Sequence, residues 1–385
     1  MIKKNKKLYI PLSEFITEYS ERNTENKYSP VAVGKYGIRS RESIYSKELA
    51  SDYSKNKLIY MNTLTVGMGS KQIDVGVLID DITYSVSPAY HTYKIANINA
   101  KYLDYCIQCR NKDMFNRFAK RGSRQGKTVD LKRWITYKIP VYDDASQAEI
   151  VDHLNRAQLL IELRKKQLEK LDQLIKARFV EMFGDIKLNP NEYQMCKIEE
   201  LLKSCEAGWS GNGTQRVKQK NEIAVLKVSA VTKGYFNPYE CKVLDDQKNI
   251  KKYIFPEKGD LIFSRANTRE MVGATAVITQ DYPDLILPDK LWKIKFKEDI
   301  NVFYIKHVLS SKFIREKFSA ASTGTSGSMF NVSMKKFKSI EIPVAPFFLQ
   351  NQFATFVKQV DKSKFIDTNI IPKGGFYYGN KFFIS

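Results

Sequence analysis

Seven cations gather in one short stretch of the chain, between residues 116 and 133. They face a single acid, Asp130, and glycine, serine, glutamine and threonine lie among them. Cations neutralise phosphates and release counterions, and Arg or Gln can form paired hydrogen bonds with guanine or adenine edges. The stretch therefore indicates contact with nucleic acid. Its side chains with this chemistry are Arg117, Lys120, Arg121, Arg124, Gln125, Lys127, Lys132 and Arg133.

A comparable stretch spans residues 315–338, where Ser, Thr and Gly occupy the centre and lysines follow. Several other exposed-looking cations and glutamines carry the same chemistry, so we predict basic loops in two separate parts of the chain. For any single cation, a solvated surface charge remains the alternative. These further candidates for DNA contact are Arg39, Arg41, Lys71, Gln72, Gln215, Arg216, Lys218, Lys220, Arg265, Arg269, Lys335 and Lys336.

Residues that would carry catalysis are missing from the sequence. Residues 122–128 resemble a phosphate-binding P-loop but are one residue short, because Arg121 stands where the first glycine is needed. Cys106 and Cys109 form a C-x-x-C inside a predicted helix, with no second pair to complete a zinc site. The three histidines lack the neighbours of a triad or a metal site. We therefore predict no catalytic residues, no metal site and no cofactor in this chain.

The whole chain is strongly basic, with 63 Lys and Arg against 42 Asp and Glu in 385 residues, a formal net charge of +21. Such a charge suits nucleic acid; a basic protein that is merely soluble, or one with an acidic partner, is the alternative. With 43% hydrophobic residues the chain is not disordered, and its length allows two domains. No apolar run approaches 18 residues, so we expect no membrane span. The absence of an apolar region after the basic start and the scattered cysteines favour a cytoplasmic location.

A long internal repeat organises the chain. Residues 129–141 align without a gap with residues 332–344, at an offset of 203, and both segments end in Ile-Pro-Val. The same offset pairs Gln147 with Gln350 and Leu154 with Val357. A solenoid repeat would be 20–50 residues long. The spacing therefore predicts two similar heads, each followed by a helix.

Residues 145–183 carry a seam of side chains at alternating spacings of four and three residues, without Pro or Gly, which is typical of a coiled coil. Asp143, Asp144 and Ser146 offer N-capping oxygens, and Gly184 suits the C-terminal end. At 1.5 Å per residue this helix would be a rod of roughly 58 Å. We interpret it as a spacer between the heads; an ordinary long core helix is the alternative. The apolar seam comprises Ile150, Leu154, Ala157, Ile161, Leu168, Leu171, Ile175 and Met182, with Phe353, Val357 and Val360 in the second helix.

The second helix is predicted to start near Phe348 and to fail after Phe365, about twenty residues earlier than the first. We interpret the Phe- and Tyr-rich tail as a departure from the repeat, of the kind that a truncation or frameshift leaves. A genuine short strand or an interaction tail is the alternative. The shortened helix predicts that Leu168, Leu171 and Ile175 lack cover from this chain.

The expected domain boundaries follow from these patterns. Residues 1–143 form the first head, with strands near 58–60, 75–79 and 135–141 and a helix over 101–118. Residues 144–184 form the spacer helix. Residues 185–346 form the second head, with strands near 223–228 and 260–263 and a helix over 302–318. Residues 347–365 form the shortened second helix and 366–385 a divergent tail.

Together these features resemble the specificity subunit of type I restriction–modification systems. The resemblance covers residues 1 to about 365. It rests on the repeated Ile-Pro-Val segments, on the helix starts at Gln147 and Gln350, and on the strand at residues 259–265. It implies an α+β fold in which two similar α/β target-recognition domains are separated by long helices that pack as an antiparallel coiled coil.

The resemblance also implies a division of labour. This non-catalytic chain would read a bipartite double-stranded DNA target. Two methylation subunits carrying S-adenosylmethionine would modify adenine N6, and restriction subunits using ATP and Mg²⁺ would cleave, as in phage defence. The alternative is a two-headed DNA-binding or coiled-coil adaptor protein that works alone. A stand-alone nuclease or methyltransferase is disfavoured by the missing motifs.

Overall fold

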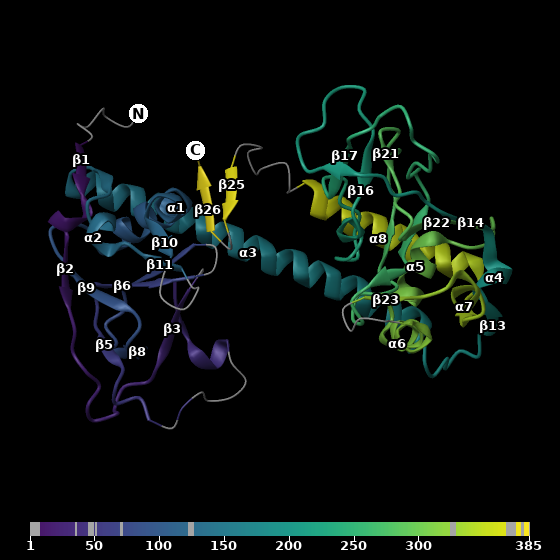
Figure 1. The fold of residues 1–385 in the computed structure, drawn as a ribbon. Coiled ribbons are helices and arrows are strands. Elements are labelled where there is room, and N and C mark those ends of the chain that lie inside the picture. Colours follow the sequence, from purple (N-terminus) through teal and green to yellow (C-terminus); the bar gives the residue numbers. More distant parts are fainter. Residues whose placement is uncertain are drawn as a thin grey trace. The chain divides into compact units, whose positions relative to one another are not determined.

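The computed structural model describes residues 8–34, 37–44, 50, 52–69, 72–121, 127–323, 329–366, 375–378 and 381–384. The chain forms two compact units, residues 1–165 with the segment from residue 371, and residues 166–370. Helix α3 (Asp144–Phe183) begins in the first unit and ends in the second (Figure 1). Both units combine helices with small sheets, which is the predicted α+β fold. The predicted domains differ from these two units, because the sequence analysis divides the chain at the ends of the helices. Those boundaries stay a prediction.

The first unit is built on a four-stranded antiparallel sheet that packs against helix α1 (Ala100–Phe118). Leu64 and Val66 of the sheet, Leu103 of α1 and Trp134 of α2 (Leu131–Trp134) are fully buried in one core. In their order across the sheet, the strands are β2 (Ile16–Tyr19), β9 (His91–Ile95), β6 (Thr63–Met68) and β7 (Ile73–Leu78). The paired strands outside this sheet are β1 (Leu8–Pro11) with β12 (Lys138–Val141), β3 (Val31–Gly34) with β4 (Gly37–Ser40), β5 (Lys57–Ile59) with β8 (Tyr84–Val86), and β10 (Ala119–Arg121) with β11 (Lys127–Val129).

The second unit repeats the same sheet. In both units, the sheet strand that comes first in the chain pairs with the one that comes last. This last strand pairs on its other side with the strand that comes second in the chain. The strands of this sheet, in order, are β14 (Leu202–Ala207), β22 (Leu291–Phe296), β18 (Leu261–Ser264) and β20 (Thr275–Val277). A second sheet comprises β15 (Gly213–Thr214), β17 (Cys241–Leu244), β16 (Ala224–Leu226) and β21 (Leu285–Ile286), and the remaining pairs are β13 (Gln194–Lys197) with β24 (Glu341–Val344) and β19 (Ala266–Asn267) with β23 (Phe330–Asn331).

The helix predicted over 302–318 is in fact two helices, α5 (Val302–Ser310) and α6 (Lys312–Ala321). Ser311 separates them because its extended backbone ends the first helix and its side chain accepts a hydrogen bond from the Ile314 N–H, which caps the second. The remaining short helices are α4 (Ile198–Leu201), α7 (Met334–Lys338) and the 3₁₀ turns η1 (Leu12–Glu14), η2 (Arg41–Ser43) and η4 (Val228–Ala230).

Within the second unit, α8 (Phe347–Ile366) packs antiparallel against the C-terminal part of α3. The ring of Phe353 lies 5.3 Å from that of Phe179 and 5.7 Å from that of Phe183, between ring centres. Further along α8, Lys364 Nζ lies 2.7 Å from the Asp172 carboxylate. Rising numbers on α8 thus meet falling numbers on α3, as in an antiparallel coiled coil.

This packing corrects the prediction that Leu171 and Ile175 lack cover. Ile175 is only 4% exposed and shares a core with Val357 and Val360, and Leu171 packs against the same core. Because α8 starts at the second head and runs backwards along α3, its 20 residues cover the end of α3 nearest that head. Leu168, just before this stretch, is half-buried.

His307 of α5 sits between the same helices as a neutral aromatic ring. Its ring lies 4.9 Å from that of Phe353 and 5.8 Å from that of Phe179, and Nδ1 lies 2.8 Å from the Phe303 carbonyl oxygen. Burial lowers the pKa of His307 to about 3. The histidine therefore serves packing at this helix junction.

The C-terminal tail contains β25 (Gly375–Tyr378) and β26 (Lys381–Ile384), which pair as an antiparallel hairpin. These strands agree with the short strand that the sequence left open as the alternative. The tail differs from the long helix that follows the first head, so the two repeats diverge here.

The junction of α3 and α8 predicts the cost of truncating its central ring. Phe353→Ala should lower the free energy of unfolding of the second unit by about 3–5 kcal/mol, because Phe353 is fully buried against Phe179 and Phe183. Phe348→Ala, at a ring 62% exposed on the same helix, is the matched control and should change it by less than about 0.5 kcal/mol. Urea denaturation of the full chain measures both. Equal effects of the two substitutions would contradict this packing.

Candidate nucleic-acid interface

The basic stretch of the first head is mounted on a two-stranded hairpin. β10 pairs antiparallel with β11, so that Ala119 opposes Val129 and residue 121 opposes residue 127. Phe118 and Val129, at the base of this hairpin, are buried in the core of the first unit. The core therefore fixes the position of the two strands that flank residues 122–126.

The second head closes its Gly/Ser/Thr segment in the same way. Thr323 and Asn331 exchange two backbone hydrogen bonds of 3.0 Å. β23 pairs in addition with β19, and the Val332 N–H donates to the Arg265 carbonyl at 2.9 Å. Each head thus has a pair of antiparallel flanks that we call its hairpin: residues 119–121 with 127–129 in the first head, and Thr323 with Asn331 in the second.

A short basic helix follows each hairpin. Asp130 caps α2 and Ser333 caps α7, each by accepting a backbone N–H three residues on. Trp134 and Phe337 anchor these helices and are fully buried. The remaining faces carry exposed cations, and these are Lys132 and Arg133 on α2 and Lys335 and Lys336 on α7. The arrangement holds two cations beside each hairpin and leaves them in contact with solvent.

Two predicted arginines flank the hairpin of the second head. The guanidinium of Arg269 lies 5.8 Å from the centre of the Phe330 ring, and its Nε donates to Ser319 Oγ at 3.4 Å. Arg265 Nε donates to the Asp289 carbonyl at 3.2 Å. Lys336 Nζ donates to the Ala321 carbonyl at 2.9 Å. The structure therefore brings Arg265 and Arg269 next to β23, and Lys335 and Lys336 follow on α7.

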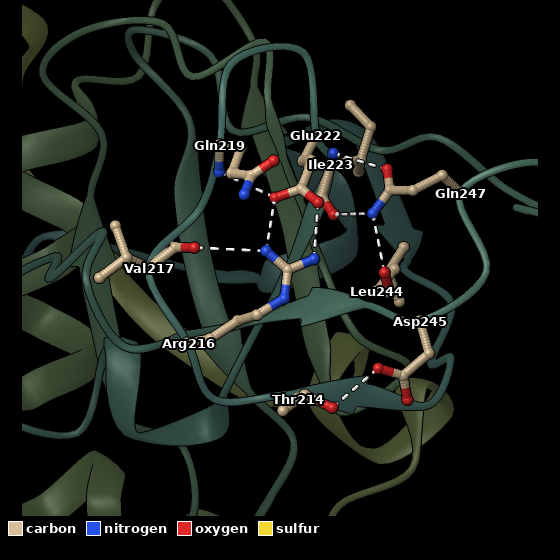
Figure 2. A network of polar contacts seen from close by, with 9 residues as sticks. All are labelled: Thr214, Arg216, Val217, Gln219, Glu222, Ile223, Leu244, Asp245 and Gln247. Carbon is tan, nitrogen blue, oxygen red and sulfur yellow. Dashed lines mark hydrogen bonds and ion pairs between the residues drawn. The ribbon is translucent and has the colours of Figure 1, made fainter.

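Arg216 belongs to a separate loop, and a carboxylate holds it there. Figure 2 shows its guanidinium donating to both oxygens of Glu222, at 2.6 and 2.8 Å, and to the Val217 carbonyl at 3.3 Å. The Gln219 N–H donates to the same carboxylate at 2.8 Å. The hydrogen bonds from Arg216 and then Gln219 lower the pKa of Glu222 to about 2. This arginine braces its own loop, so its charge is largely balanced.

The base of this loop is fixed by Gln247. Its Oε1 accepts the Ile223 N–H at 2.8 Å, and its Nε2 donates to the carbonyls of Ile223 and Leu244 at 3.0 and 2.8 Å (Figure 2). Beyond the brace, Lys218 forms an ion pair with Asp284, while Gln215 and Lys220 are exposed.

The described candidates of the first head also have polar neighbours. Arg117 Nε donates to Asp113 at 2.8 Å and its guanidinium lies 5.8 Å from the Tyr137 ring centre. Lys120 Nζ lies 3.3 Å from the Asp130 carboxylate. Although burial opposes it, the hydrogen bonds from Tyr137 and Arg117 hold the pKa of Asp113 below its ordinary value.

The remaining candidates of the first head lie on other elements. Arg39 is exposed on β4, and the Arg41 guanidinium lies 5.4 Å from the Tyr53 ring centre. The Gln72 carbonyl oxygen accepts the Gly69 N–H at 3.1 Å. The predicted Lys71, Arg124 and Gln125, and the side chains of Arg121 and Lys127, lie outside the described residues.

Sequence reasoning missed the acids that balance several of these cations. Glu222 lies six residues from Arg216, and a local pairing could have been suspected from that spacing. Asp284 lies 66 residues from Lys218, and no sequence signal connects them. Over the part of the chain that the structure describes, no group of acidic, cysteine and histidine side chains suits a metal ion. Nor does any helix of that part have the length and apolar composition to cross a bilayer.

Comparison with known proteins identifies the second half of the chain. Residues 190–372 match the model of a family described as the type I restriction modification DNA specificity domain. These residues belong to that family. The matched residues thus include Thr323 and Asn331, the basic helix α7 and all of α8.

Two relatives extend this result. The type I restriction enzyme EcoEI specificity subunit of Escherichia coli is 25% identical over 163 residues, 42% of this chain. The match spans 27%, about a quarter, of that subunit's length. The crystal structure of the type I restriction–modification S subunit from M. genitalium has a TM-score of 0.52 with 12% identity, over 96% of this chain and 93% of that one. At this identity the likeness shows the fold, and it covers both heads.

The basic helix of the specificity domain can be tested through salt. Lys335→Ala with Lys336→Ala should weaken DNA binding by the full chain similarly for all sequences. It should also reduce the slope of log affinity against log salt by about 2, because each phosphate contact contributes about 0.9. Lys187→Ala, an exposed cation just beyond α3, is the matched control. An unchanged slope in the double variant would remove α7 from the interface.

The Arg216 brace predicts a pH-dependent loop. The pKa of Glu222 falls from 4.5 to about 2 on folding, so the ion pair stabilises the folded loop above pH 4.5 and is lost as the pH falls towards 2. Protection of the Gln219 amide from hydrogen exchange, relative to its intrinsic rate, should follow this course. Glu222→Gln should have low protection at every pH. Protection that is equal in both proteins would contradict the brace.

Proposed function

We propose that the chain is the DNA sequence-recognition subunit of a type I restriction–modification complex. Each head reads one half of a bipartite target, and the chain directs adenine-N6 methylation or restriction by partner subunits. It carries no catalytic group itself. The observation that supports this most is the duplication of one specificity domain's architecture, with the same strand order and the same hairpin and basic helix in both units.

The chemistry of the hairpins suits the edges and backbone of double-stranded DNA. Exposed cations on α2 and α7 fit phosphates, which position a protein on the duplex. A two-stranded ribbon such as β10 with β11 suits the major groove, where each base pair presents a distinct pattern of donors and acceptors. Helix α3 would join the heads at the spacing of the two half-sites, as the geometry of any two-headed reader sets its half-site distance.

The partners are those that the resemblance to type I specificity subunits implies. Two methylation subunits would bring S-adenosylmethionine and flip the adenine out of the duplex. Restriction subunits would bring the ATP- and Mg²⁺-dependent motor and nuclease. We place this assembly in the cytoplasm.

Exposed leucines on α3 support a methylation subunit as a partner. Three leucines of its middle section are strongly exposed: Leu159 is 56%, Leu160 66% and Leu163 52% exposed. Neighbouring exposed leucines on a helix favour a protein partner over water. An amphipathic helix of the methylation subunit would cover them, in the way that helices add to a coiled coil.

The proposal predicts a methylation pattern. Co-expression of the full chain with candidate methylation subunits should place N6-methyladenine at one split motif in the host DNA, because both heads contribute half of the target. Single-molecule sequencing measures it. The same subunits without this chain are the control and should give no such motif.

Two other outcomes have definite meanings. A stable complex without methylation at any split motif would contradict the proposed function of this chain. Sequence-specific binding by the chain alone, with no complex formed, would favour the stand-alone DNA-binding adaptor instead.

A further inference from the structure

In the first head, hydrogen bonds of one buried side-chain amide hold the start of helix α3. Gln147, in the first turn of α3, is 2% exposed. Its Oε1 accepts the Asn99 N–H at 3.0 Å, and its Nε2 donates to the Tyr142 carbonyl at 2.7 Å. Asn99 is the residue that caps α1. One side chain therefore ties the start of α3 to the start of the head's main helix.

In the second head, a buried amide makes the same hydrogen bonds at the start of α8. Gln350, in the first turn of α8, is 1% exposed. Its Oε1 accepts the Asn301 N–H at 2.8 Å, and its Nε2 donates to the Ala345 carbonyl at 2.7 Å. Asn301 caps α5, as Asn99 caps α1. The two amides thus have the same partners at equivalent positions in the two units.

A tyrosine adds a second fixed point in each unit. Tyr102 of α1 donates its hydroxyl to the Pro140 carbonyl at 2.8 Å, and Tyr304 of α5 donates to the Pro343 carbonyl at 2.9 Å. Both prolines lie in the Ile-Pro-Val strands that run directly into α3 and α8. Two hydrogen-bonded points on one helix start leave it little freedom to tilt.

These amides do more than stabilise. Replacing either amide by an apolar side chain would leave a buried N–H and a buried carbonyl without a partner, which costs stability. Directional hydrogen bonds in addition select one arrangement of the groups that they join. Gln147 and Gln350 are separate from the two hairpins in sequence and sit at the helix starts, so what they select is the angle between head and helix.

We propose that Gln147 and Gln350 are positioning residues that set which spacing between the two half-sites the protein accepts. This inference rests on the proposed function. A helix of 40 residues is a lever of about 60 Å, so a tilt of about 10° at its start moves its far end by about 10 Å. That displacement is close to three base pairs at 3.4 Å each. A small loss of angular definition therefore becomes a change of spacing.

The test replaces the amide by an apolar side chain of similar length. Gln147→Met and Gln350→Met, each in the full chain with its methylation subunits, are compared on plasmids whose half-sites are separated by graded spacers. Wild type should methylate one spacer length. Each variant should methylate neighbouring lengths to within about tenfold of the preferred one, because about 10° of tilt spans several lengths. The half-site sequences should stay unchanged.

Gln158→Met is the matched control. Gln158 lies on the same helix as Gln147, and its Nε2 donates an exposed hydrogen bond to Glu162 at 3.4 Å. This variant should keep the wild-type spacing. Thermal denaturation of each protein separates spacing from stability. If a methionine variant does not fold, Tyr102→Phe and Tyr304→Phe replace it, since each removes one hydroxyl from the same junction.

The outcomes distinguish the two proposals. A folded variant that methylates only the wild-type spacing would overturn the positioning role. So would a uniform loss of methylation at every spacing. Failure of wild type to methylate any split target would instead overturn the proposed function itself.

Discussion

Each head passes into its helix through a connection of two residues, and this short junction constrains the rest of the chain. β12 ends at Val141 and α3 begins at Asp144; β24 ends at Val344 and α8 begins at Phe347. Both strands are held in place by pairing with β1 and β13, and their central isoleucines, Ile139 and Ile342, are fully buried. The direction of each helix start therefore follows from the core of its head. The packing of α8 on α3 and the placement of the exposed leucines follow from that direction.

Electrostatics divides the cations of this basic chain into two groups. Some are occupied within the protein: Arg216 by Glu222, Lys218 by Asp284 and Arg117 by Asp113. Exposed ion pairs of this kind contribute little stability, but they fix loops and lower the charge available to a ligand. The cations of α2 and α7 stand on short helices anchored by Trp134 and Phe337. The net charge of +21 thus indicates that a polyanion is a suitable partner, and the two anchored helices indicate where that polyanion would bind.

Patterns local to the chain made much of the fold predictable. The seam of residues 145–183 and the repeated Ile-Pro-Val segments indicated α3, α8 and two similar heads. Predictions that depended on long-range geometry were less successful. The prediction that Leu171 and Ile175 lack cover was wrong, because their cover depends on the direction in which α8 returns. The prediction of one helix over 302–318 was wrong, because Ser311 caps a second helix. For the site, the sequence indicated the cations and the basic loops. It could not indicate that Asp284, 66 residues away, occupies Lys218.

The two heads share the buried contacts that fix their shape and differ in the segments that would contact a ligand. Trp134 and Phe337 are both fully buried, and the pairs Tyr102 and Tyr304, and Gln147 and Gln350, make the same hydrogen bonds in each unit. The hairpin segments differ: residues 122–126 include Arg124 and Gln125, whereas residues 324–328 hold only Gly, Thr and Ser. In the second head, cations come instead from Arg265 and Arg269 beside the hairpin. Side chains of different reach and donor pattern select different base edges. Two heads built alike but equipped differently would therefore read two different half-sites, and the target would be a split sequence without internal symmetry.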